Sequence, residues 1–352
     1  MLDVFDESSL AALVGAFGGI LLGLAARLGR FCTLGALEDA LYGGQTTRIA
    51  MWGVAIGVAI AGTFGLIGIG LLNPAKVIYL ISGTTVVAAV VGGLMFGYGM
   101  ALSGNCGYGA LARLGGGDLR ALVMLLVMGL AAYATISGPL APLRLALFQP
   151  SPLSDIPQGL VFDLARILGT DPSQIGVVVG VFIVAGSVIM TIQEDRKIAL
   201  FWGAVVGVAI VSGWAGSQWV NNYSFDAVAV TSHSFAAPVG GTILYTMTST
   251  GSTLSFGIGS VFGVLAGSIF GSLVKGHFRW EACEDPRELR RQIAGALMMG
   301  IGAVVAMGCS VGQGLSAMSV LSYTAPITLL FIYLGAFVGL RQLIEGRVWP
   351  AE

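Results

Sequence analysis

The chain has 352 residues, of which 56% are hydrophobic and only 10% are charged, and its mean hydropathy is +0.88. Soluble domains carry about 25% charged residues, so this composition is that of an integral membrane protein. The net charge of −1 excludes a polybasic nucleic-acid binder. Glycine occurs 54 times, roughly twice its ordinary frequency, which in an apolar chain indicates closely packed or broken helices.

Nine apolar segments follow one another, most of them close to the ~20 residues that a helix needs to cross the hydrocarbon core. They lie near residues 9–29, 49–72, 84–103, 119–138, 175–193, 198–214, 254–275, 290–308 and 325–341. The acidic start, MLDVFDESS, lacks the basic region of a cleaved signal peptide, so we expect the first segment to remain in the mature protein. The predicted fold is an all-α integral membrane protein of about nine transmembrane helices, forming one transport domain over residues 1–352.

Three other stretches, at residues 31–44, 105–114 and 309–320, are moderately apolar but too short to cross. Non-helical backbone at membrane depth is tolerated only where it is buried in protein or lines a cavity, so these stretches are predicted to be short re-entrant helices. The two long polar connections are 149–174 and 215–253. Trp214 and Trp219, with Gln218, are expected at the outer interface, where tryptophan is enriched.

The distribution of positive charge predicts the orientation of the chain. The side of the N-terminus receives three of the 17 lysines and arginines, namely Lys76, Arg144 and Arg166, and the opposite side receives the other 14. The positive-inside rule therefore places the N-terminus outside and the C-terminus in the cytoplasm of a multi-pass protein of the cell inner membrane.

The two halves of the chain resemble each other. A shift of 203 positions aligns GGLMFGYGMALSGNCGYG (92–109) with GALMMGIGAVVAMGCSVG (295–312), with seven identities in 18 positions that include Cys106 with Cys309. Chance similarity between glycine-rich helices is the alternative, and the paired cysteine argues against it. Because five spans separate the two copies, they are expected to cross in opposite directions, as inverted repeats do. The predicted halves are residues 1–148 and 175–341.

Three of the four cysteines occupy similar places. Cys32, Cys106 and Cys309 each follow a span and begin a segment that is too short to cross, whereas Cys283 lies in a charged loop, where an exposed thiol without a role is expected. The spacings show no disulfide framework and no Cys-x-x-Cys motif, and the two histidines are distant in sequence, so neither a metal nor another cofactor is predicted. A buried cysteine without a role is the alternative for each of the three.

The motifs GRFC after the first span, FGYGMALSGNCGYGALARLGGGDLRAL in the first half and LMMGIGAVVAMGCSVGQGLSA in the second resemble the YeeE/YedE family of sulfur-compound transporters, typified by thiosulfate uptake proteins. The resemblance covers most of the chain. It implies an inverted-repeat fold with nine spanning helices and functional cysteines at Cys32, Cys106 and Cys309. It also implies a small cytoplasmic sulfur-carrier protein as a partner. Asn105 stands where that family usually has glycine.

Thiosulfate is a dianion with three oxygens and a soft terminal sulfur, and it cannot cross hydrocarbon unescorted. Glycine-flanked helix starts present free N–H groups to an anion, and a protonated thiol adds a weak donor without adding charge. The predicted function is uptake of thiosulfate or a related sulfur anion along protonated cysteines. The predicted substrate-binding residues are Cys32, Cys106, Cys309, Gly104, Asn105, Gly107, Gly308, Ser310, Gln313 and Arg113.

Several of these assignments have a plainer alternative. Arg113 is equally explained as a cytoplasmic flanking charge, and Asn105 and Gln313 as partners in hydrogen bonds between helices. The function itself has two alternatives, a membrane sulfurtransferase that forms a cysteine persulfide and a transporter of another sulfur or selenium compound. A sulfurtransferase would need a thiolate with a base beside it, and no histidine lies near these cysteines in the sequence. A passive anion channel would need no thiols at all.

Overall fold

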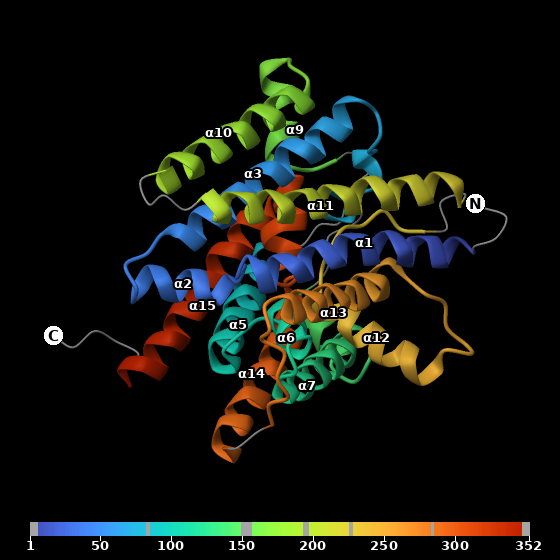
Figure 1. Ribbon diagram of the computed structural model, residues 1–352. Helices are drawn as coiled ribbons and strands as arrows, with labels where there is room; N and C mark the ends of the chain where they lie inside the picture. Colours follow the sequence, from blue (N-terminus) through green and yellow to red (C-terminus); the bar gives the residue numbers. More distant parts are fainter. Residues whose placement is uncertain are drawn as a thin grey trace.

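A computed structural model describes residues 6–81, 85–148, 157–192, 197–224, 228–282 and 285–346 (Figure 1). These residues are almost entirely helical, and in them the only extended pairing is a single β-bridge between Asp118 and Glu281. The long helices are α1 Glu7–Leu28, α3 Thr47–Gly68, α5 Val86–Ser103, α7 Leu119–Ile136, α10 Pro172–Ile192, α11 Lys197–Tyr223, α13 Phe256–Val274, α14 Pro286–Val305 and α15 Thr324–Glu345. The short elements are α2 Thr33–Leu41, η1 Pro74–Lys76, α4 Ile78–Ile81, α6 Gly107–Leu114, α8 Ala141–Leu147, α9 Leu160–Leu168, α12 Ala236–Thr248 and the π-helical η2 Gly312–Ala317.

The nine predicted spans coincide with the nine long helices of the described residues. Within the described ranges, eight helices are long and apolar enough to cross a membrane. The exception is α14, whose first turns carry Arg287, Glu288, Arg290 and Arg291. Many of the apolar side chains on the outside of the helices are exposed, including Phe182 at 73% and Ile198 at 74%, as expected of a surface that faces lipid. The prediction of an all-α membrane protein is confirmed.

Local sequence signals set several helix starts. The side chain of Asp118 accepts a hydrogen bond from the Arg120 N–H at the start of α7, and Asp285 does the same for Arg287 at the start of α14. Pro286 occupies the first position of α14, where its missing N–H costs nothing. Charged and capping residues therefore delimit these spans before any packing is considered.

The three short helical stretches predicted from the sequence form α2, α6 and the helical turns around η2. Two other expectations are corrected. The connection 215–253 is not only loop, because α11 extends to Tyr223 and α12 follows it. Trp214 is completely buried, with its indole N–H donating to Ser319 Oγ at 2.9 Å, instead of lying at the interface. Trp219, in contrast, is exposed.

A seam of glycines joins α1 to α13, which run in the same direction. A Cβ at Gly259 would overlap the carbonyl oxygen of Ala12, and a Cβ at Gly263 would overlap that of Ala16. On the facing side, Gly19 contacts the backbone of α13 in the same manner. Small residues at such spacing let helices approach to backbone contact, which is what stabilises helix pairs in lipid.

The helix pairs repeat with a two-fold pattern. Helices α3 and α11 pack in parallel through Gly203 and Gly207, as α1 and α13 do. Helix α5 packs against α15, and α14 packs against α7. Helix α5 is antiparallel to α14, because Gly99 lies against Gly295 while Gly92 lies against Gly302.

The 203-residue shift extends to elements outside the aligned motif. Helix α2 begins at residue 33 and α12 at residue 236, which are 203 positions apart. We therefore propose, in support of the predicted halves 1–148 and 175–341, that α1 to α7 correspond to α11 to α15, with α9 and α10 between them. The antiparallel α5 and α14 then cross the bilayer in opposite directions.

The seam predicts the effect of added volume. The substitution Gly263→Ala should push α13 away from α1 and destabilise the protein by about 1–3 kcal/mol, the usual cost of overpacking. Thermal unfolding of the detergent-purified protein measures this change. Gly65→Ala in α3 is the matched control, because no atom lies within 4 Å of the added Cβ. Equal melting temperatures for the two variants would contradict the seam.

Candidate functional site

Each of the three predicted cysteines stands directly before a short helix and binds its first turn. Cys32 Sγ accepts a hydrogen bond from Gly35 N at 3.5 Å, and Cys106 Sγ accepts one from Gly109 N at 3.4 Å. Cys309 Sγ accepts one from Gly312 N, also at 3.4 Å. The thiols thus take the place of the usual N-cap oxygen, and the N–H groups of the first helical residues have no partner inside the helix.

This arrangement has a sequence signal that our reading of the chain missed. All three cysteines are followed by glycine at the third position, in CTLG, CGYG and CSVG. Cys283 is followed by Glu-Asp-Pro and lacks the pattern. It lies outside the described residues.

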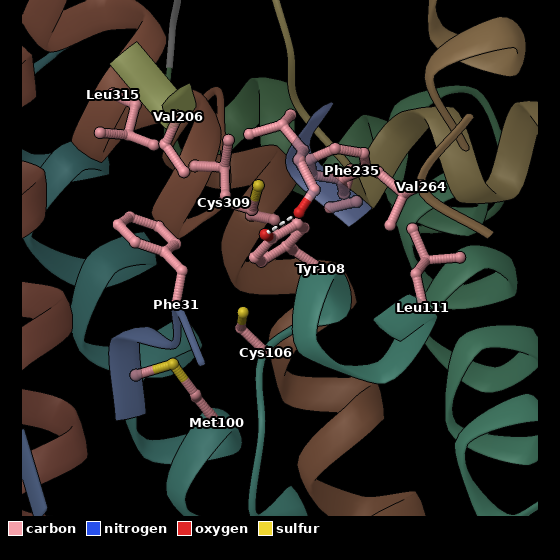
Figure 2. Close-up of a cluster of buried hydrophobic side chains, with 14 of the residues drawn as sticks. Phe31, Met100, Cys106, Tyr108, Leu111, Val206, Phe235, Val264, Cys309 and Leu315 are labelled. Atoms are coloured by element: carbon pink, nitrogen blue, oxygen red, sulfur yellow. Dashed lines mark hydrogen bonds between the residues drawn. The ribbon is translucent and has the colours of Figure 1, made fainter. Parts of the chain in front are cut away.

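The three thiols form a row through the interior, which we call the thiol row. Cys106 lies close enough to both Cys32 and Cys309 to interact with each electrostatically. Cys106 and Cys309 are buried, at 1% and 2% exposure, whereas Cys32 is partly exposed. Figure 2 shows Cys309 above Cys106, with the rings of Phe31 and Tyr108 on either side of the space between them.

Aromatic side chains wall the thiol row. Phe31 stacks on Trp52 with ring centroids 4.7 Å apart and meets Tyr108 edge-on at 6.4 Å. Tyr108 also packs against Phe235 at 5.5 Å, and its hydroxyl donates to the carbonyl oxygen of Leu22 at 2.6 Å. These contacts fix the walls and keep the centre of the row out of contact with solvent.

A cationic cavity of about 390 Å³ meets the Cys32 end of the row, and we call it the inner cavity. Its basic residues come from four parts of the chain and are Arg27, Arg30, Arg48, Arg113 and Lys275. Glu38 is the acidic residue in its lining, while Asp39 pairs with Arg48 at 3.2 Å. Burial, with Arg30 and Arg27 nearby, lowers the pKa of Lys275, as expected where positive charge accumulates.

A second cavity, of about 660 Å³, reaches Ser234 beside Cys309, and we call it the outer cavity. Its lining includes Glu7 at the start of α1, whereas the inner cavity includes Arg27 at the end of the same helix. The 22 residues of α1 span ~33 Å. The two cavities therefore open at opposite ends of a membrane-spanning helix.

The remaining predicted residues gather around the thiol row. Asn105 and Gly104 line the inner cavity with Arg113, whose guanidinium donates to the Gly104 carbonyl at 3.3 Å. Gly104 ends α5 in the left-handed conformation, at φ +74°, which favours glycine. Gly107 begins α6 in close contact with Met128.

Three buried polar side chains near the cysteines keep unused hydrogen-bonding atoms. Among the described residues, Asn105 has no partner for either its amide nitrogen or its oxygen, and the hydroxyl of Ser310 has none other than the Cys106 thiol beside it. Gln313 donates to Ala306 O at 2.7 Å, but its Oε1 has no partner. It packs against Gly308, which leaves room for it. Unsatisfied polar groups are costly when buried, so they mark a place where a polar ligand is expected.

The tertiary structure corrects the expectation, made from sequence spacing alone, that no histidine lies near the three cysteines. His277, which follows α13, lines the inner cavity together with Cys32. The distance between histidine and cysteine along the sequence therefore gave no information about their positions in space. In the described part of the chain, no three residues of the types His, Cys, Asp and Glu are grouped so as to hold a metal ion.

Comparison with known proteins gives concordant results. The family described as sulphur transport matches residues 28–338 of this chain. The chain is similar to the thiosulfate transporter TsuA of Spirochaeta thermophila, with 26% identity over 332 residues that cover 91% of this chain and 96% of the relative. It is also similar to the thiosulfate transporter TsuA of Escherichia coli, with 25% identity over 351 residues that cover 92% of each protein. The family description and both names refer to transport and not to catalysis.

The two cavities predict different reactivities of the thiols. In variants that retain a single cysteine, a membrane-impermeant thiol reagent added on the side of the inner cavity should modify Cys32 at least about tenfold faster than Cys106, because only Cys32 lines that cavity. The rate of labelling in oriented membrane vesicles measures this difference. Similar rates for both thiols would mean that the centre of the row is open.

Proposed function

The chain belongs to the sulphur transport family, and on that premise we propose that it takes up thiosulfate, or a related small sulfur anion, along the thiol row. The protein is a multi-pass membrane transporter of the all-α class. The single observation that carries the proposal is the line of three helix-capping thiols between two cavities that open at opposite ends of α1.

The geometry of the caps leaves the thiol protons available. Each sulfur already accepts an N–H from the helix that it begins, so the S–H of the neutral thiol is free to donate toward the row. A thiolate would repel a dianion, and an arginine at the centre would hold it too firmly for release. A protonated thiol is a weak donor and suits an anion that must move on.

Other donors supplement the thiols at the centre. The unpaired amide of Asn105 and hydroxyl of Ser310 flank Cys106 and can bind the oxygens of a sulfonate group. The starts of α2 and α6 add the N–H groups of their first turns, which have no partner within the helix, and the positive ends of their helix dipoles. An anion at Cys106 thus exchanges water for several weak partners and for no opposite charge.

The two cavities give the path a direction. We assign the inner cavity, with its five basic side chains, to the cytoplasmic side of the inner membrane, in keeping with the positive-inside rule. A dianion that leaves Cys32 then enters a region of positive potential. The small sulfur-carrier protein that the family resemblance implies would receive the anion at this cavity.

Removal of one thiol should break the row. Cys106→Ala should lower the initial rate of labelled thiosulfate uptake into proteoliposomes at least about tenfold, because a hydrogen bond to an anion contributes about 1.5–3 kcal/mol. Cys309→Ala should behave similarly, and Cys283→Ala is the control that should retain most of the activity. Uptake by Cys106→Ala at the rate of the parent protein would contradict transport along the thiol row.

The dependence of uptake on pH separates transport from persulfide chemistry. Uptake should decline at alkaline pH values that remove thiol protons, because each lost proton removes a donor and adds a repelling charge. A sulfurtransferase should accelerate over the same range as the thiolate fraction grows. The measurement is the initial rate of uptake with clamped ion gradients.

The variant Cys106→Ser is the control for that experiment. Serine keeps a donor that does not titrate in this range, so a partly active variant should lose the share of the alkaline decline that Cys106 causes. A rate that climbs with pH in the parent, but not in this variant, would favour the covalent reaction.

A further inference from the structure

The second half of the chain has no cysteine in the place that corresponds to Cys32. The shift of 203 residues pairs Cys32 with Phe235 and Phe31 with Ser234, so the order Phe-Cys before α2 becomes Ser-Phe before α12. Phe31 and Phe235 both pack against Tyr108. The aromatic side chain and the polar side chain have exchanged positions, and the polar group is a thiol in the first half and a hydroxyl in the second.

Ser234 joins the outer cavity to the thiol row. Its side chain lines that cavity, and its Oγ lies 3.8 Å from Cys309 Sγ, in hydrogen-bonding range for sulfur. Cys309 is not part of the cavity lining and is 2% exposed. Ser234 thus belongs to the cavity lining and also contacts Cys309, which places its hydroxyl between the two.

A glycine makes room for this contact. A Cβ at Gly312 would lie 2.7 Å from Ser234 Oγ and 3.6 Å from the Tyr79 hydroxyl. The Ser234 hydroxyl, the Tyr79 hydroxyl and the Cys309 thiol therefore converge on the same small space above the first turn of the helix. Only a residue without a side chain leaves that space open.

The neighbours of Ser234 hold it in position. The ring of His233 bonds Ser260 Oγ at 2.7 Å, and the carbonyl oxygen of His233 accepts from Ser316 Oγ at 2.6 Å. Ser232 Oγ donates to Ile210 O at 2.8 Å. The two preceding residues are thus held by structural hydrogen bonds, which fix the backbone from which Ser234 reaches Cys309.

We propose that Ser234 is a further substrate-binding residue, the outermost donor along the thiol row, and that it binds an oxygen of the sulfonate end of the incoming sulfur anion. The proposal rests on the proposed function. A hydroxyl is a stronger donor than a thiol and matches a hard oxygen, whereas the polarizable Cys309 sulfur, deeper in the row, matches the soft terminal sulfur. The substrate class is thus an anion with oxygens at one end and sulfur at the other, admitted with its sulfur end first.

The test compares kinetic constants for labelled thiosulfate uptake by the full-length protein in proteoliposomes. Ser234→Ala should raise the apparent KM about tenfold or more, while Vmax stays within about twofold, because the lost bond belongs to binding at the outer end. Ser234→Cys, which keeps a weaker donor, should lie between the parent and the alanine variant. Thr253→Ala removes an exposed hydroxyl from the same cavity and should leave both constants unchanged.

Equilibrium binding supplies a readout that does not depend on transport. The dissociation constant for thiosulfate, measured by calorimetry on the detergent-purified protein, should rise by a similar factor in Ser234→Ala and remain parental in Thr253→Ala. An unchanged dissociation constant and KM in Ser234→Ala would overturn the proposal. A fall in Vmax alone would also overturn it, because that result assigns Ser234 to structure and not to substrate.

The two proposals fail separately. If Cys106→Ala abolishes uptake while Ser234→Ala is like the parent, the thiol row stands and the Ser234 site is wrong. If Cys106→Ala transports like the parent, the proposed function fails, whatever the result at Ser234.

Discussion

Backbone contact between helices is the constraint on which this structure depends. In lipid, helices gain nothing from hiding apolar surface from one another, so close packing must hold them together. Glycines place α13 on α1, α11 on α3 and α14 on α5 at distances that a Cβ would prevent. The short helices α2 and α6 follow directly after α1 and α5, so the seams also determine where their first turns lie. The glycine contacts between the long helices therefore determine where the candidate site forms.

In the proposed path, each cysteine combines a structural and a functional role in one atom. Each thiol sulfur accepts a backbone N–H that the start of a helix would otherwise leave unsatisfied. That bond orients the side chain without using its proton. A serine in the same place would also cap the helix, but it would offer a harder and stronger donor. The choice of thiol fits a substrate whose sulfur end is polarizable and whose passage requires weak binding at each step.

The chemistry of the path changes along its length. The inner cavity carries a concentration of basic side chains, whereas the centre holds neutral thiols, an amide and a hydroxyl among aromatic walls. The basic side chains are thus gathered at the inner cavity, where they can attract or release an anion without trapping it. The narrow centre uses dipoles, whose binding energy is small enough for the anion to leave. The proposed correspondence between the halves accounts for the recurrence of similar capping geometry, and Ser234 marks a position where the two halves differ.

The sequence alone determined the membrane class, the positions of the long helices and the three thiols at the starts of short helices. Apolarity, capping residues and the repeated glycine-cysteine motif are local properties that do not depend on which segments meet. The tertiary structure decided the presence of helix α12, the burial of Trp214 and the placement of His277 and Cys32 on one cavity. So was the contact of Ser234 with Cys309, across 75 residues. Each of these features depends on how closely helices that are distant in sequence approach one another. That distance is set where glycines of two facing helices meet, and no single segment of the sequence contains both helices.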